Sequence, residues 1–169
     1  FCEKPPVNNI KDLKALKKLS YSKIYFNYNY RFSHLANILK NSYKYKLGKF
    51  LYGSLAIGHG LATKKNYHKS WRADKLKTPF GIIEILSIHS IDLISYIFGV
   101  SKIYFNKLNI AKKTKNFDTV SIKTITKDKK SIEIFNSYSS PLIEKKIFIF
   151  ENGYVHQNEN YIYIFGPKN

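Results

Sequence analysis

A line of polar side chains on an otherwise apolar segment is the clearest candidate for chemistry in this sequence. Between Gly81 and Phe98, one helix face carries four residues at spacings of four, three and four: Ile85, His89, Asp92 and Tyr96. An imidazole with an ordinary pKa of about 6.5 could accept a proton from a substrate hydroxyl near neutral pH. A hydrogen-bonded histidine of the core is the alternative that this helix by itself leaves open.

A second candidate lies at the start of the chain, in Glu3-Lys4-Pro5. Here a lysine stands between a carboxylate and a proline ring that fixes the backbone. General motifs add little, because the sequence has no phosphate-cradling glycine-rich loop, no Gly-x-Ser-x-Gly elbow and no His/Cys spacing suited to a metal. We therefore expect no metal site.

The elements that must position these residues begin with alternating helices and strands. Asn9 is a good helix cap, and Ser33 is another that precedes a stripe of Leu35, Ile38 and Leu39. We predict, in order, a helix over Asn9–Leu19, a strand over Lys23–Tyr30, a helix after Ser33 and a strand over Lys49–Ile57.

The second half of the chain has a different character. Gly58–Pro79 has no clear period and is predicted to be a long surface loop, and Gly81–Phe98 is predicted to be a mostly buried helix closed by Gly99. Strand-like runs then follow: Ile103–Leu108, Thr119–Ile125, Ser131–Tyr138, Ile143–Phe150 and Tyr161–Phe165. Helices followed by a run of antiparallel strands predict one α+β unit.

Composition limits the classes of partner. The 169 residues carry 29 Lys and Arg against 11 Asp and Glu, a net charge of +18, but Arg31 and Arg72 are the only arginines. A solvated lysine-rich surface is favoured over nucleic-acid recognition, which would draw more on arginine, although a binder that stacks Tyr and Phe on bases stays open. The longest apolar run, Phe80–Phe98, is broken by polar residues, so no membrane span is expected.

The ends and the redox chemistry of the chain give two further expectations. The sequence has no Met and opens on Phe1, so we expect a piece of a longer protein. Cys2 is the single cysteine and excludes an internal disulfide, which favours a reducing, cytoplasmic compartment.

Taken in order, these pieces resemble the Gfo/Idh/MocA family of NAD(P)-dependent sugar oxidoreductases. The resemblance spans nearly the whole chain and rests on an ordered set of short motifs: Glu3-Lys4-Pro5, Asn29-Tyr30-Arg31-Phe32, Leu47-Gly48-Lys49, Ser70-Trp71-Arg72, Gly81, His89-Ser90-Ile91-Asp92-Leu93 and Ile97-Phe98-Gly99. It implies helices packed on one face of a mostly antiparallel open sheet. Residues 1–8 would end a truncated Rossmann domain, and residues 9–169 would form a substrate-binding and oligomerisation domain.

The resemblance also implies a reaction, a hydride transfer between NAD or NADP and a hydroxyl or keto carbon of a sugar, sugar nucleotide or cyclic polyol. Lys4 and His89 would be catalytic, and Lys4 with Pro5 would contact the cofactor. Asp92 would be a possible orienting acid, and Tyr30, Arg31, Trp71 and Arg72 would bind substrate, with structural packing as the open alternative for these four. The sequence has no Gly-x-Gly-x-x-Gly turn, so the missing N-terminal domain would hold most of the cofactor and this chain alone would be inactive.

One departure from the family pattern bears on the mechanism. Many members have an acidic residue four positions before the histidine, where this chain has Ile85. Glu84 lies five positions before His89, about 140° away around an α-helix of 3.6 residues per turn. Glu84 could substitute only if a bulge shifted the register of the helix.

The late strands suggest a homo-oligomer, because in this family the open face of the sheet often packs against another subunit. Strands around Tyr104, Phe135, Phe148 and Tyr163 could supply such a face, or could cover the helices. A non-catalytic dimerisation module of the same fold is therefore the alternative function.

Overall fold

One open sheet forms the body of the molecule and is described, with the rest of the chain, by a computed structural model of residues 1–7, 9–19, 24–111 and 114–167. Its strand order is β2-β3-β4-β1-β5-β6-β7. Neighbouring strands are antiparallel except for β1 and β4, which are parallel. The strands are β1 Phe50–Gly58, β2 Val100–Leu108, β3 Thr119–Thr126, β4 Ser131–Ser137, β5 Ile143–Phe150, β6 Gly153–Asn158 and β7 Tyr161–Phe165.

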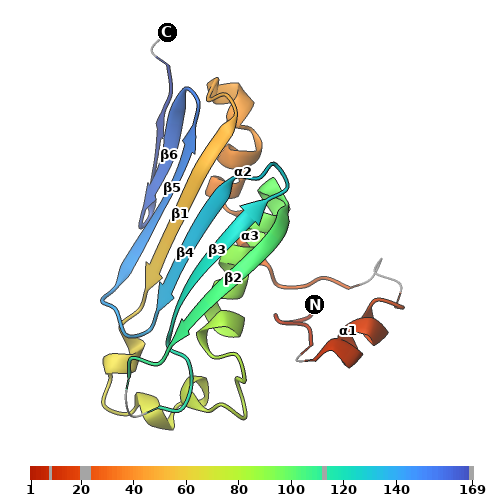
Figure 1. The fold of residues 1–169 in the computed structure, drawn as a ribbon, viewed down its shortest axis with the longest axis vertical. Coiled ribbons are helices and arrows are strands. Elements are labelled where there is room, and N and C mark those ends of the chain that lie inside the picture. The colour runs from red at the N-terminus through yellow and green to blue at the C-terminus, as the bar shows by residue number, and fades with distance from the viewer. Residues whose placement is uncertain (8, 20–23, 112–113, 168–169) are drawn as a thin grey trace.

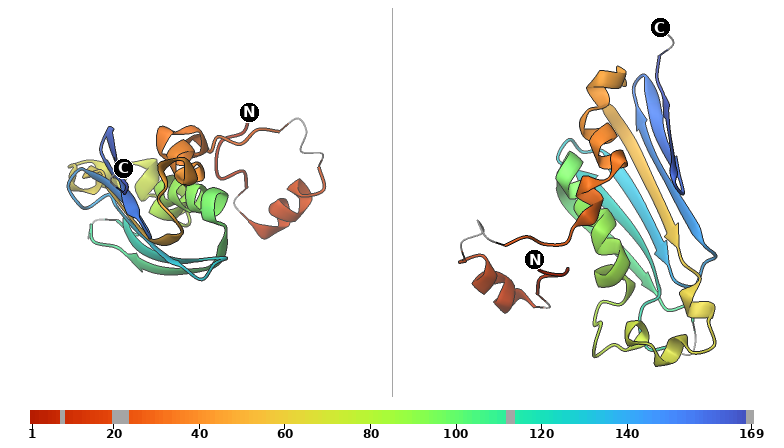
Figure 2. Two further views of the ribbon diagram at one scale, coloured as in Figure 1. Left: turned by 90° about the horizontal axis from the view of Figure 1, so that it is seen from above. Right: turned by 180° about the vertical axis from the view of Figure 1, so that it is seen from behind.

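Helices cover one face of this sheet and leave the other bare, so the expected α+β arrangement is confirmed (Figure 1). The helices are α1 Ile10–Leu16, α2 His34–Lys40 and α3 Ile88–Phe98. Asn9 and Ser33 cap α1 and α2 as predicted, since their side chains accept hydrogen bonds from the Asp12 and Ala36 amides. Figure 2 shows α2 and α3 against the sheet, whereas α1 and the N-terminus lie beside the body.

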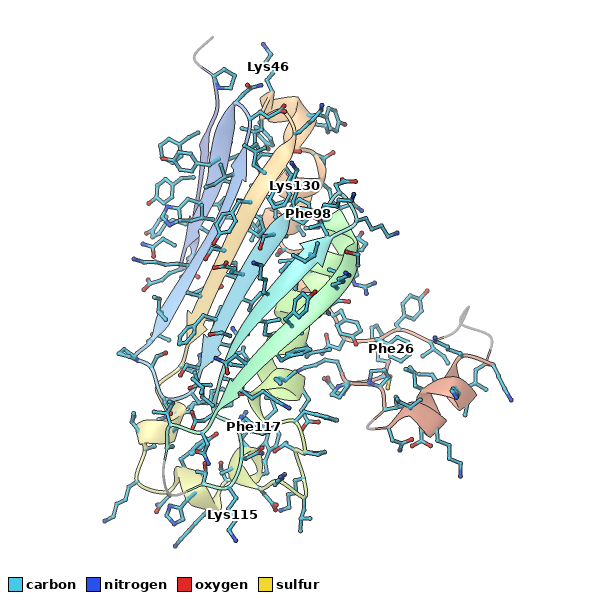
Figure 3. The ribbon with its side chains drawn as sticks, in the orientation of Figure 1. Phe26, Lys46, Phe98, Lys115, Phe117 and Lys130 are labelled. Carbon is cyan, nitrogen blue, oxygen red and sulfur yellow. The ribbon has the colours of Figure 1, made fainter. Side chains whose placement is uncertain are left out.

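The core lies between α2, α3 and the covered face of the sheet. Inward-facing side chains of the central strands are fully buried: Leu55, Ile57, Val120, Ile122, Ile132, Ile134 and Phe148. At the far end of α3, the ring of Phe98 stacks on Phe50 at 4.1 Å and on Phe148 at 5.9 Å (Figure 3). Burial of this apolar layer is what holds the helices on the sheet.

The strand predicted over Lys23–Tyr30 is wrong for the described residues 24–30, while Lys23 lies outside them. This stretch makes a single parallel bridge between Cys2 and Phe26, and the chain then forms a short 3₁₀ helix, Asn29–Phe32. Among the described residues, the alternating pattern has no strand ladder to join, because the bridging backbone beside it is Cys2 alone. Tertiary context therefore overrides the β-propensity of these residues.

The middle and the end of the chain also differ in detail. The predicted loop Gly58–Pro79 contains three short 3₁₀ helices, Leu61–Thr63, Tyr67–Lys69 and Trp71–Ala73, and Tyr67 and Ala73 are buried. The run Gly153–Asn158 was not predicted as a strand but forms β6. It pairs with β5 on one side and β7 on the other.

The sequence left open whether Phe148 joins the open face or covers the helices, and the structure decides for the helices. Strand alternation places Phe148 on the covered face, where it is 0 % exposed. Tyr104, Phe135 and Tyr163 do lie on the open face, where they are 54 %, 37 % and 46 % exposed. Across the described residues, no helix is long and apolar enough to cross a membrane.

The two faces of the sheet predict opposite outcomes for two phenylalanines. Phe148→Ala should lower the free energy of unfolding by about 3–5 kcal/mol, because it opens a cavity in the core. Phe135→Ala, on the open face, should cost less than about 1 kcal/mol. Urea unfolding of both variants measures the difference, and equal losses would contradict the assignment of the faces.

Candidate functional site

The segment predicted as one helix contains a π-helical turn, Ile83–Ser87, directly before α3. In this turn the Ile88 amide bonds to the Ile83 carbonyl, five residues back. Residues five apart therefore come to the same side, and Glu84 moves toward the side of His89. This is the register shift that the sequence required before Glu84 could take the place of the missing acid.

Two features at the start of the segment favour this turn. Gly81 has a φ of +56°, and a Cβ there would lie 2.4 Å from the Phe117 carbonyl oxygen, so only glycine fits. The Glu84 carboxylate accepts a hydrogen bond from the Phe80 amide at 3.0 Å. Burial raises the pKa of Glu84, whereas the amides of Phe80 and Gly81 and the charge of Lys4 act to lower it.

Lys4 belongs to the N-terminal segment and reaches the π-helical turn in the middle of the chain. Its ammonium donates a hydrogen bond to the Ile85 carbonyl. The bridge at Cys2 anchors this segment, and the Asn27 side chain donates to the Glu3 carboxylate at 2.9 Å. Burial lowers the pKa of Lys4, and the positive charge of Arg72 lowers it further, while Glu3 and Glu84 oppose the change.

His89 lies next to this ammonium at the start of α3. Its ring stacks on that of Tyr30 at 5.0 Å and an interplanar angle of 29°. Nδ1 is buried, and no described residue forms a hydrogen bond with it. Burial and the charge of Lys4 lower the pKa of His89 to about 4, so the imidazole is neutral at pH 7 and able to accept a proton.

Arg31 and Asp92 form a bidentate ion pair that joins the 3₁₀ helix Asn29–Phe32 to α3. Arg31 Nε donates to Asp92 Oδ2 at 2.8 Å, and Nη2 pairs with Oδ1. The guanidinium also lies over the rings of Tyr28 and Tyr96, at 5.2 and 5.1 Å. Both oxygens of Asp92 thus bind Arg31, and Asp92 acts on His89 only through its charge, which raises the pKa of the imidazole.

Trp71 and Arg72 enter the same region from the loop after β1. The Arg72 guanidinium lies 4.4 Å from the centroid of the Trp71 ring, and its charge acts on Lys4. Pro5 follows Lys4 and is half-buried. The structure therefore brings Lys4, Arg72 and His89 to one region, although each comes from a different part of the chain.

Two tyrosines beside Arg72 were not anticipated from the sequence. Tyr138, just after β4, is 2 % exposed, lies close enough to Arg72 for that residue to act on its pKa, and packs against Tyr67 with 6.2 Å between ring centroids. Burial raises the pKa of Tyr138, and it raises that of Tyr67 to about 12. Both phenols are therefore neutral hydrogen-bonding groups at ordinary pH.

A buried lysine was also missed. Lys146 in β5 is 4 % exposed, and its ammonium donates to Glu144 Oε1 at 2.6 Å and to Gln157 Oε1 at 3.2 Å. It also lies 5.1 Å from the centroid of the Tyr30 ring. Strand alternation could have found it, since Lys146 shares a face with the buried Phe148 and Phe150.

Other features of the described residues lie apart from this site. A pocket of about 360 Å³ lies on the open face of the sheet, lined by side chains that include Ser54, Tyr104, Lys123, Glu133 and Phe135. The sheet separates it from His89, which belongs to the helix layer. No group of three His, Cys, Asp or Glu residues suited to a metal occurs in the part of the chain that the structure describes.

Comparison with known proteins gives matches among solved structures alone. No protein-family model matches the sequence, and no curated protein matches it. An NAD-binding oxidoreductase from Klebsiella pneumoniae superimposes with a TM-score of 0.87 at 14% identity, covering 99% of this chain and 50% of that chain. Levoglucosan dehydrogenase in complex with NADH and levoglucosan gives a TM-score of 0.86 at 16% identity, with the same coverage.

A third match is an oxidoreductase from Agrobacterium radiobacter in complex with NAD+, L-tartaric acid and magnesium, with a TM-score of 0.76 at 18% identity, covering 98% of this chain and 51% of that chain. The chain thus spans about half the length of the solved chains it matches. At these identities the likeness shows a shared fold. The fold that the Gfo/Idh/MocA resemblance implied is confirmed.

The environment of His89 predicts an acidic titration. Its NMR signal should titrate with a midpoint near pH 4 instead of about 6.5, and His89→Asn identifies the signal by removing it. Because the folded-state pKa is lowered, the unfolded chain takes up the proton first, and stability is lost as the pH falls from about 6.5 to about 4. Urea unfolding across this window should show a smaller loss for His89→Asn, and a midpoint between pH 6 and 7 would contradict the prediction.

Proposed function

We propose that this chain is the substrate-binding half of an NAD(P)-dependent oxidoreductase that acts on a CH–OH group of a sugar, sugar nucleotide or cyclic polyol. One observation carries the proposal: a lysine ammonium and a neutral histidine, 85 positions apart in the sequence, meet at a π-helical turn. A cation and a neutral base side by side suit the removal of a proton from a hydroxyl group. Residues 1–8 would then end the preceding domain, and 9–169 would form this half.

The residues present fit one end of the cofactor. When bound, the nicotinamide accepts or donates the hydride. Lys4 and Pro5 would lie beside the nicotinamide, and the unpartnered His89 Nδ1 shows that the imidazole has a hydrogen-bonding position to spare. The sequence has no glycine-rich turn for the pyrophosphate, so we assign that contact to a Rossmann domain outside this chain.

The chain's own residues have distinct parts in the proposed proton transfer. His89 takes the proton of the reacting hydroxyl, since the imidazole is neutral at pH 7 and its Nδ1 has no partner among the described residues. The Lys4 ammonium hydrogen-bonds the same oxygen and stabilises the negative charge that develops there. The Ile85 carbonyl fixes the position of Lys4.

Glu84 replaces the acidic residue that many members of the family have at the position of Ile85. The π-helical turn rotates it toward the helix side that carries His89, and the charge of Lys4 acts on both groups. We propose that its carboxylate balances the Lys4 charge and keeps the ammonium directed toward the substrate oxygen.

The substrate contacts are proposed from position and exposure. Tyr30, Trp71 and Arg72 are at least partly exposed and lie around Lys4 and His89, whereas Arg31 is committed to Asp92. Arg31 and Asp92 then shape the site by fixing the segment that carries Tyr30. The solved structures of similar fold include complexes with levoglucosan, L-sorbose and L-tartaric acid, which have hydroxylated carbons in common and motivate tests with polyols and sugar acids.

His89→Asn in the full-length protein should lower kcat of NAD(P)-linked sugar oxidation by about 10²–10⁴-fold, because the general base is lost. KM should change little, since the asparagine keeps a hydrogen-bonding group. Steady-state kinetics on a panel of sugars and polyols measures both constants. His156→Asn, on the bare face of the sheet, is the matched control, and an unchanged kcat for His89→Asn would remove His89 from the mechanism.

A second candidate function, assembly through the open face, is favoured by the aromatic side chains on that face. Tyr154, Tyr161, Tyr163 and Phe165 on β6 and β7 are 39–69 % exposed, and the rings of Tyr154 and Phe165 stack at 4.4 Å. Exposed aromatic clusters of this kind are typical of protein interfaces. We propose that two copies of the chain pair through this face, with or without catalysis.

Sedimentation velocity should therefore detect a dimer. Replacing Phe135 and Tyr163 together by Lys should weaken it at least about 100-fold, because two buried rings become charged groups. Leu76→Lys, at a fully exposed loop position, is the control that should leave the dimer intact. A chain that stays monomeric at high concentration would contradict this candidate.

A further inference from the structure

The ion pair of β5 between the buried Lys146 and the partly exposed Glu144 is the strongest feature that the proposed reaction does not use. On the covered face, β5 presents Glu144, Lys146, Phe148 and Phe150 in turn. Phe148 and Phe150 pack with Phe50 beneath the end of α3, at ring distances of 6.5 and 5.7 Å from Phe50. The covered face is therefore apolar at one end of β5 and charged at the other.

Lys146 is held on several sides. Glu144 Oε1 lies 2.6 Å and Gln157 Oε1 lies 3.2 Å from its ammonium, and the Tyr30 ring lies 5.1 Å away. At 4 % exposure, the ammonium is out of reach of a substrate. A desolvated cation over an aromatic face is held more strongly than an exposed one, so the Tyr30 ring is fixed from the sheet side.

The same Tyr30 ring stacks on His89 at 5.0 Å. A continuous chain of contacts thus runs from Glu144 through Lys146 and Tyr30 to the imidazole. The other charged groups that act on His89 are Lys4 and Glu3 from the N-terminal segment and Asp92 from α3 itself. None of these three residues belongs to the sheet, from which Lys146 contacts the Tyr30 ring.

We propose that Lys146 is a positioning residue: paired with Glu144 and Gln157, it holds the Tyr30 ring and thereby sets the orientation of the His89 imidazole. The inference rests on the proposed function for its catalytic consequence, but the positioning itself is a property of this chain. Burying the Lys146 ammonium costs desolvation, and such a pair is poor evidence for stability, so a positioning role explains why this charge stands where an apolar residue would pack.

Ring-current shifts provide the test, because protons above an aromatic face resonate upfield. Tyr30→Leu removes the ring and defines the full change in the imidazole signals of His89. Lys146→Met should produce most of that change, since the ring is released, and Lys146→Arg should restore the signals of the unsubstituted chain. Lys145→Met is the matched control, because it removes the same charge from the neighbouring position on the opposite face of β5.

Lys146→Met should fold, since the methionine fills the space and Glu144, with 38 % of its side chain exposed, can be hydrated. A thermal melt checks this. If it does not fold, Glu144→Gln replaces it and should move the His89 signals in the same direction by loosening the ammonium. Unmoved His89 signals in the folded variant would overturn the proposal, as would an equal change in Lys145→Met.

Kinetics separates this inference from the proposed function. In the full-length protein, Lys146→Met should lower kcat about tenfold or more and leave the KM of the cofactor unchanged, because only the base is misplaced. The NMR measurement requires no cofactor and no substrate. Shifted signals without any oxidoreductase activity would therefore keep the positioning role and reject the proposed reaction, whereas activity with unmoved signals would do the reverse.

Discussion

The hydrogen bond from the Lys4 ammonium to the Ile85 carbonyl joins the two ends of the candidate site, and the remaining geometry depends on it. The acceptor belongs to a π-helical turn, which the chain enters through Gly81 at positive φ. The extra residue in that turn rotates Glu84 toward the side of the helix that carries His89, and the charge of Lys4 acts on both groups. In a regular α-helix without this extra residue, a carboxylate five positions before the histidine would point away from the site.

The cationic environment at this turn explains the protonation of the site. Lys4 and Arg72 lie near each other, and partial burial makes the charge of Lys4 costly. His89 responds by remaining neutral, with a pKa of about 4, and Glu84 lies close enough to moderate the charge of Lys4. The arrangement suits a neutral base beside a fixed cation, which is the combination that the proposed proton transfer requires.

The two faces of the sheet have different roles. The covered face holds the apolar core at one end and the Glu144–Lys146 pair under Tyr30 at the other. The open face carries exposed aromatic side chains on β6 and β7. A single register therefore determines both which residues support the candidate base and which are offered to a partner.

Local patterns in the sequence were sufficient for the caps at Asn9 and Ser33, for α3, for most strands and for the candidates Lys4 and His89. They failed for residues 24–30, which within the described part of the chain bridge to Cys2 and join no ladder, and they left open the face of Phe148, which depends on the register of β5. Lys146 could have been found from the alternation of β5, whereas Tyr138 follows the end of β4, where alternation no longer indicates which side chains are buried.

By itself, then, the sequence determined the residue types and their periodicity, which are sufficient for an α+β fold and for an imidazole on an apolar helix. Only the tertiary structure decided that the helix begins with a π-helical turn, that Asp92 is taken by Arg31, and that Lys146 lies beneath Tyr30. The physical reason is that these outcomes depend on contacts between residues distant in the sequence, such as Gly81 with Phe117, Arg31 with Asp92 and Lys146 with Tyr30, and local propensity carries no information about such pairs.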